Sequence, residues 1–163
     1  MSAPTPAVAA LSRAGLAFEL HTYDHRGGAI SGIEAAERLG LDLARVYKTL
    51  VVDAGTGARD IHSSAAIAVV PVAERLDLRA AARAIGAKRV EMVPAEVAER
   101  LSRSAVGAIS PVGFARALPT VLDATIEGHP TVFVSAGRRG LELELAPEVL
   151  VRATGGIVAA ICA

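Results

Sequence analysis

The order in which helical and extended patterns follow one another constrains the fold of this chain most. A helix over about 6–15 precedes a strand, and a second helix, two strands and two more helices follow up to residue 101. After Gly107 the pattern changes to short apolar runs separated by proline and glycine, closed by a last helix. Because strands and helices do not alternate regularly, the chain is not a repeated βαβ array. We therefore expect an α+β fold with a mixed or antiparallel sheet.

Glycine and proline set the ends of these elements. Expected helices cover 6–15, 35–39, 78–85, 95–101 and 147–153, and expected strands cover 17–23, 47–53, 61–70, 120–122, 131–134 and 141–145. Ser31 and Glu34 have the spacing of a capping box before the second helix. The turn Gly55-Thr-Gly57 between two strands predicts a hairpin. With no internal repeat or linker, 163 residues favour a single domain over 1–163.

The amino-acid composition limits which residue types can form the core and which classes of partner the protein can bind. Hydrophobic residues make up 52% of the chain and aromatic residues only 3%, so the core must consist of Ala, Val, Leu and Ile. Lys+Arg and Asp+Glu both total 17, which excludes a globally basic nucleic-acid coat but allows a local basic patch. The run 157–163 is far shorter than the ~20 residues that span a bilayer. Since the first residues also lack the pattern of a signal peptide, we expect a cytoplasmic protein.

Lys48 is the first candidate for chemistry. Period-two geometry places it on one strand face with Leu50 and Val52. The chain contains only two lysines, Lys48 and Lys88, so a retained lysine suggests a need for a compact ammonium group. The pattern equally allows Lys48 to begin the strand and extend its ammonium to solvent.

Two glycine-containing segments are candidate ligand loops. Gly107-Ala-Ile-Ser-Pro-Val-Gly113 contains small residues that let a ligand approach the backbone N–H groups. Gly137 and Gly140 flank Arg138 and Arg139 at an expected hairpin tip, where two guanidinium groups suit phosphate oxygens. Ordinary turns between strands explain both segments as well.

A further basic group lies around the third expected helix. Arg79 and Arg83 share a helical face, and Lys88 and Arg89 follow that helix. The group is either a solvated face or a patch that follows phosphates.

Metal and nucleophile signals are weak. His21-Thr-Tyr-Asp-His25 groups possible ligands, but no matching third ligand spacing follows, so we expect no metal. Neither a Gly-x-Ser-x-Gly elbow nor a phosphate-binding P-loop is present. The single cysteine, Cys162, lies in an apolar run beside the C-terminus, which favours a structural thiol over a nucleophile.

Several ordered blocks resemble the YbaK/EbsC family, and within it the Cys-tRNA(Pro) deacylases. The resemblance extends from Thr5 to about Gly156. The blocks are Thr5-Pro-Ala-Val8, His21-Thr-Tyr-Asp-His25, Val46-Tyr-Lys-Thr-Leu50, Gly86-Ala-Lys-Arg-Val-Glu-Met92, Gly107-Ala-Ile-Ser-Pro-Val-Gly113, Leu118-Pro-Thr120 and Val134-Ser-Ala-Gly-Arg-Arg-Gly-Leu-Glu142.

The resemblance implies a fold and an activity. The fold is a compact α+β domain with a mixed, partly barrel-like sheet and flanking helices, related to the editing domain of bacterial prolyl-tRNA synthetases. The activity is removal of cysteine mischarged on tRNA(Pro), in trans to the synthetase. The implied partners are the 3′ end of an aminoacyl-tRNA and, in a ternary complex, prolyl-tRNA synthetase, with no DNA, membrane, metal or organic cofactor.

The resemblance also assigns site residues. The family's essential lysine falls on Lys48, and further pocket positions fall on Tyr23, Gly107, Ser135 and Glu142, where some relatives carry Asp. In the resembling enzymes the substrate's own thiol attacks its ester carbonyl, so the enzyme orients groups rather than supplying a nucleophile.

Basic residues outside that pocket are expected to touch the tRNA. These candidate contacts are Arg138, Arg139, Lys88 and Arg89.

Two other functions fit the same sequence. One is an Ala-tRNA(Pro) deacylase of the same superfamily, which could not use a substrate thiol. The other is a non-catalytic adaptor that binds tRNA or the synthetase.

Overall fold

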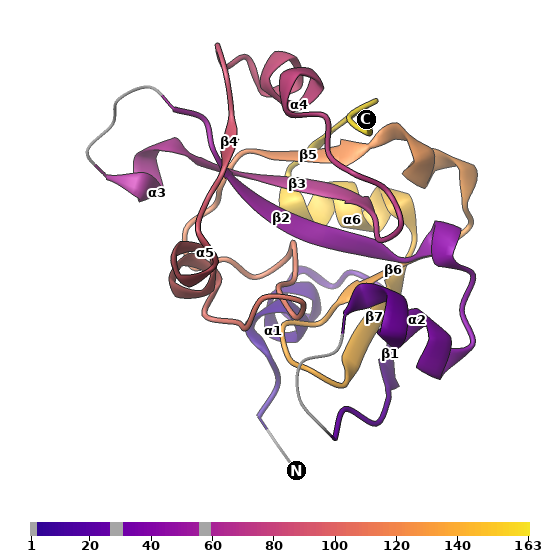
Figure 1. Ribbon diagram of the computed structural model, residues 1–163. Coiled ribbons are helices and arrows are strands. Elements are labelled where there is room, and N and C mark those ends of the chain that lie inside the picture. Colours follow the sequence, from indigo (N-terminus) through magenta and orange to yellow (C-terminus); the bar gives the residue numbers. More distant parts are fainter. Residues whose placement is uncertain (1–2, 27–30, 56–59) are drawn as a thin grey trace.

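The computed structural model describes residues 3–26, 31–55 and 60–163. Within them, six α-helices and two short 3₁₀ turns surround eight strands (Figure 1). The helices are α1 (Pro6–Ala14), α2 (Gly32–Leu39), α3 (Ile61–Ser64), α4 (Leu78–Ile85), α5 (Ala95–Ser102) and α6 (Pro147–Thr154). The 3₁₀ turns are η1 (Leu43–Arg45) and η2 (Ala124–Gly128). No helix in these residues is long and apolar enough to cross a membrane.

Local capping explains where these helices begin and end. The Ser31 hydroxyl accepts a hydrogen bond from the Glu34 N–H at 3.2 Å, which confirms the predicted capping residue of α2. Asp77 caps α4 in the same way through the N–H groups of Arg79 and Ala80. Gly86 ends α4 in the left-handed conformation that glycine adopts without steric cost.

The strands form two sheets, and the expected α+β class is confirmed. They are β1 (Glu19–Thr22), β2 (Tyr47–Asp53), β3 (Ala65–Pro71), β4 (Glu91–Met92), β5 (Thr120–Asp123), β6 (Val132–Ser135), β7 (Leu141–Leu145) and β8 (Ile157–Ala159). The five-stranded sheet has the order β4-β2-β3-β5-β8 and is mixed, since β4, β2 and β3 pair antiparallel while β3, β5 and β8 pair parallel. The order β1-β7-β6 forms a smaller antiparallel sheet.

Sequence expectations were wrong at three places in this sheet. The expected strand over 61–70 begins four residues later, because Asp60 accepts a hydrogen bond from the His62 N–H and starts the one-turn helix α3. Strands β4 and β8 were not expected. The hairpin of β2 and β3 is confirmed, although Thr56 and Gly57 of its expected turn lie outside the described residues.

Small aliphatic side chains pack on both faces of the larger sheet. One face, which includes Val51, Ile67 and Val69, packs with α1, α5, α6 and the smaller sheet. The other face, which includes Val52 and Val70, packs with α4. Figure 1 shows α4 on one side of β2 and β3, and α1, α5 and the smaller sheet on the other.

The two sheets meet at the beginning of β2. Val46 and Phe133 form a parallel bridge there, and Ala36 of α2 packs over it. Further along β2, the same edge pairs with β4 through Val52 and Met92. Among the described residues, no strand pairs with this edge between those two points. The fold therefore leaves a short open edge on β2.

Candidate functional site

A cavity of about 550 Å³ lies at the open edge of β2. This volume falls within the ~300–1,000 Å³ of small-molecule sites. Its walls come from α2, β2, β4, α5, the loop after α5, and the ends of β6 and β7. The lining residues are Ser31, Gly32, Glu34, Val46, Tyr47, Lys48, Thr49, Leu50, Val51, Met92, Val93, Ala95, Ala98, Val106, Gly107, Ile109, Ser135 and Glu142. Four of the five expected pocket residues, Lys48, Gly107, Ser135 and Glu142, are among them.

Lys48 enters this cavity as a half-buried cation. It pairs with Val70 across β2 and β3, which places it on the sheet face of Leu50 and Val52 as the alternation predicted. None of the ion pairs formed by the described residues involves Lys48. An ammonium group without a carboxylate partner remains available to an anionic or carbonyl ligand.

Lys48 also interacts electrostatically with Cys162 near the C-terminus. Burial and the neighbouring Asp123 raise the pKa of the Cys162 thiol to about 12, while Lys48 acts weakly in the opposite direction. Cys162 is thus a neutral thiol near pH 7, and it does not line the cavity. This placement agrees with a structural thiol.

Glu142 is a buried acid in the lining of the cavity. Only 5% of its surface is exposed, and its Oε2 atom has no hydrogen-bond partner among the described residues. Burial raises the pKa of Glu142 to about 8, so the side chain is mainly protonated at pH 7. A protonated carboxyl group can donate a hydrogen bond as well as accept one.

Thr49 is a cavity residue that the sequence did not reveal. Its hydroxyl is buried without a partner in the described part of the chain. The Val51 carbonyl accepts a hydrogen bond from Val93 at the β4 edge. Since backbone groups alternate between the two edges of an antiparallel strand, the N–H and C=O of Thr49 face the open edge as well. Residue 49 therefore presents three polar groups to one space.

The loop after α5 forms the wall opposite β2. Gly107 has a φ of 91°, a conformation that favours glycine. No acceptor within the described ranges bonds to its N–H, which leaves a backbone donor at the cavity wall. At the other end of the loop, Gly113 has a φ of 93° and lies against the backbone of Pro6 and Ala7.

Ser135 fixes this loop rather than offering a free hydroxyl. Its Oγ donates to the Ala108 carbonyl at 2.8 Å and accepts from the Gly137 N–H at 3.1 Å. The bond to Ala108 holds the loop against the end of β6, and the bond from Gly137 fixes the turn that follows this strand. We conclude that Ser135 shapes the cavity wall.

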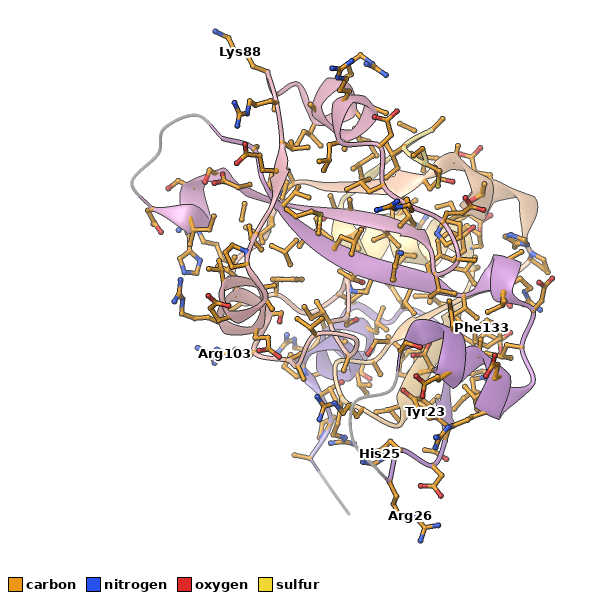
Figure 2. All side chains as sticks on the ribbon, viewed as in Figure 1. Tyr23, His25, Arg26, Lys88, Arg103 and Phe133 are labelled. Carbon is orange, nitrogen blue, oxygen red and sulfur yellow. The ribbon has the colours of Figure 1, made fainter. Side chains whose placement is uncertain are left out.

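Tyr23, the fifth expected pocket residue, lies beside the cavity and does not line it. Its backbone N–H donates to the Gly140 carbonyl at 3.0 Å, and Figure 2 shows its side chain below α2. Burial is the main cause that raises the pKa of Tyr23, and the charge of Glu142 acts in the same direction. Tyr23 is therefore within electrostatic reach of Glu142.

The expected tRNA contacts fall into two places. Arg138 and Arg139 border a second cavity of about 500 Å³, together with Arg103. Lys88 and Arg89 border a different hollow beside α4, where Arg89 forms an ion pair with Glu91. Figure 2 shows Lys88 and Arg103 on well separated parts of the surface. The structure therefore does not join the four residues into one patch.

Possible metal ligands gather on the smaller sheet. Potential ligand atoms of Glu19, His21 and Glu144 lie within 4.8 Å of one another. His21 Nε2 is 2.9 Å from Glu144 Oε1, and Arg45 lies 3.7 Å from the other Glu144 oxygen. Protein partners thus already satisfy Glu144, and His25 lies beside Gly140 instead of joining this cluster.

Comparisons with known proteins agree on one family. The model of the aminoacyl-tRNA editing domain matches residues 29–153, which contain all the lining residues of the cavity. A protein of Enterococcus faecalis that carries the name Cys-tRNA(Pro)/Cys-tRNA(Cys) deacylase EbsC is 37% identical over 128 residues, 78% of this chain and 74% of its own.

Solved structures have the same fold. One is described as a trans-editing enzyme for prolyl-tRNA synthetase, with a TM-score of 0.80 and 26% identity, and the match covers 95% of this chain and 93% of the other. Another, a hypothetical protein, has a TM-score of 0.78 and 26% identity, with 94% and 96% covered.

Proposed function

Because the chain belongs to the family of aminoacyl-tRNA editing domains, we propose that it is a deacylase that removes cysteine from tRNA(Pro) in trans. The name of the Enterococcus relative supports the substrate, and the neighbouring trans-editing structure supports a site of action outside the synthetase. The observation that carries the proposal is the cavity itself. Around one space it brings a lysine, a backbone N–H and a buried carboxyl oxygen that have no partner among residues 3–26, 31–55 and 60–163.

In the proposed reaction the substrate supplies its own nucleophile. The cysteine sulfur attacks the ester carbonyl carbon, a carbon–sulfur bond forms, and the bond from that carbon to the ribose oxygen breaks. The thiol proton ends on the ribose oxygen, so the products are a cyclic thiolactone and free tRNA, and no water is consumed. This route fits the cavity, since its described lining contains neither cysteine nor histidine.

The chain's own residues would position these groups. The Lys48 ammonium would hold the phosphate or ester end of the substrate and stabilise negative charge in the transition state. The Gly107 N–H would donate to the carbonyl oxygen as it becomes an oxyanion. Ser135 would keep that donor in place through Ala108.

The buried polar atoms would orient the amino acid. Glu142 Oε2 has no hydrogen-bond partner in the described part of the chain, and the α-ammonium group of an aminoacyl ester would supply one and favour the ionised carboxylate. The Thr49 hydroxyl and backbone lie on the same wall. Tyr23 would act from beside the cavity, through its proximity to Glu142.

We further propose that the whole chain acts as one deacylase domain and that the RNA approaches from the side of Arg138 and Arg139. Lys88 and Arg89 lie in a different hollow, where they would contact a more distant part of the tRNA or the synthetase. A ternary complex with prolyl-tRNA synthetase is suggested only by the neighbouring structure.

The test is release of labelled amino acid from Cys-tRNA(Pro) and Ala-tRNA(Pro), measured side by side. We expect rapid loss of cysteine and none of alanine. Lys48→Ala should lower the cysteine rate at saturating tRNA by about 100-fold or more, the size expected for a group that stabilises transition-state charge. Lys48→Arg keeps the charge but not the compact ammonium, and Arg152→Ala, at an exposed position of α6, controls for the loss of any cation.

Each outcome decides between the alternatives. Turnover by Lys48→Ala at the wild-type rate, with an intact thermal unfolding transition, removes Lys48 from the mechanism. Loss of alanine moves the protein to the sister activity, which needs an activated water because alanine has no thiol. No loss of either amino acid favours the adaptor.

A further inference from the structure

The second cavity has a positive charge that takes no part in the proposed chemical step. We call it the arginine pocket, and define it by Thr5, Arg103, Ser104, Gly137, Arg138 and Arg139, which are among the residues that line its volume of about 500 Å³. These residues come from three distant parts of the sequence. They meet because the Ser104 hydroxyl donates to the Gly137 carbonyl at 2.9 Å.

The three arginines of this pocket have no acidic partner in the described structure. The cationic members of the ion pairs in the described structure are Arg26, Arg45, Arg89 and His21. The ten residues outside the described ranges (1–2, 27–30 and 56–59) include no Asp or Glu in the sequence. The acid one turn before Arg103 on α5, Glu99, instead accepts from the Val106 N–H at 2.9 Å. All three arginines are exposed, and no carboxylate of the described residues pairs with them.

Arg103 occupies a conformation that its residue type disfavours. It ends α5 with a φ of 58°, and it is the only residue other than glycine with a positive φ among those described. Other helices of this chain end in glycine at the same position. An arginine held there brings a third cation to the pocket, and a strained backbone position of this kind is a reason to look for a function.

The arginine pocket and the cavity at β2 lie on the two sides of one wall, the loop after α5 and the end of β6. Ser135 lines the cavity. Its hydrogen-bond partners, Ala108 at 2.8 Å and Gly137 at 3.1 Å, line the arginine pocket. Gly107 lines the first space and its neighbour Ala108 the second. A chain-like ligand that ends in the cavity can therefore continue directly over the loop onto the arginines.

We propose that the arginine pocket binds backbone phosphates of the RNA 3′ strand whose aminoacylated terminal nucleoside occupies the cavity. The inference rests on the proposed function for the identity of the RNA. Guanidinium groups pair with phosphate oxygens in two parallel hydrogen bonds, and such contacts position a strand without reading its bases. Three exposed arginines beside a cavity of nucleoside size suit this polyanion.

The test is binding of uncharged tRNA, followed by fluorescence anisotropy over a range of salt concentrations. Arg103→Ala, Arg138→Ala and Arg139→Ala should each weaken binding several-fold and lower the slope of log K against log salt by about 0.7, the value for one phosphate on a single strand. Arg152→Ala, an exposed arginine of α6, is the matched control and should retain both values.

Two further measurements separate this inference from the deacylase proposal. Cysteinyl-adenosine, which has no phosphate, should react at the wild-type rate with all three pocket variants. A tRNA without its single-stranded 3′ end should bind wild type and pocket variants equally. Failure of wild type to deacylate anything refutes the proposed function but leaves the binding test intact.

Wild-type affinity and salt slope in all three pocket variants would overturn the inference. So would an equal loss on the tRNA without its 3′ end. Variants that keep RNA binding but lose binding to prolyl-tRNA synthetase would show that the pocket contacts an acidic protein surface instead.

Discussion

Replacement of Glu142 by glutamine should make the protein less sensitive to alkaline pH. The Glu142 carboxyl group titrates near pH 4.5 in the unfolded chain, while burial raises its pKa in the folded protein to about 8. Between these values the unfolded chain loses the proton and the folded protein keeps it, so the free energy of unfolding falls as pH rises. One pKa unit corresponds to about 1.4 kcal/mol, and the full shift therefore costs the folded state about 5 kcal/mol above pH 8.

Glu142→Gln removes this titration and keeps the size of the side chain. We expect the variant to gain about 3 kcal/mol on wild type between pH 5 and pH 8, measured by urea unfolding at both values. Other titrating groups cancel in the difference between the two proteins.

Glu144→Gln on the same strand is the opposite control. A hydrogen bond from Thr131 is the main cause that lowers the pKa of Glu144, so its contribution should be lost only below about pH 4.5. A Glu142→Gln difference that stays constant from pH 5 to pH 8 would show that the carboxyl is ionised in the folded protein, and would refute the reasoning.

Two predictions concern the frame of the site. Gly113→Ala should destabilise the protein by about 1–3 kcal/mol more than Gly15→Ala, as measured by chemical unfolding. Both glycines have a positive φ, but only at Gly113 would an added Cβ lie 2.6 Å from backbone atoms of α1. Equal losses would mean that this contact relaxes freely. Tyr47→Phe should cost about 1 kcal/mol in urea unfolding, because the Tyr47 hydroxyl is bonded to Thr125 Oγ1 at 2.8 Å in a buried position; an unchanged midpoint would show that this bond contributes nothing net.

Local signals made much of the fold predictable. Helix α4 and strand β7 have the predicted bounds, since Asp77 and Gly86 cap the helix and alternating leucines define the strand. Strand β8 could not be recognised in the same way. It has three residues and pairs in parallel with β5, so that its partner is distant in sequence. The one-turn helix α3 had a signal in Asp60, but the apolar run after it favoured a strand.

The residue pattern alone singled out Lys48 and the loop that begins at Gly107, whereas Ser135 and Glu142 were assigned only through the resemblance. Alternation places Glu142 and Glu144 on one face of β7. The two side chains nevertheless differ, because Glu142 is buried in the cavity wall while Glu144 pairs with His21. Thr49 had a usable signal, since it adjoins Lys48 on a strand whose edge is open. Arg103 had none, because a left-handed cap on an arginine leaves no trace in the sequence.

The open edge of β2 explains how a chain without a distinctive catalytic motif can form a candidate site. An unpaired strand edge exposes N–H and C=O groups and normally has to be covered. Here the bridge at Val46 and the pairing at Val52 end on either side of the gap, and α2 and α5 form the walls of a cavity instead of a continued sheet. Filling the gap with another strand would remove the backbone donors and the space at once. In the mechanism proposed above, the substrate brings its own thiol, so the protein would need only this space, one cation and fixed polar groups, and the cavity at the β2 edge is lined by residues of all these kinds.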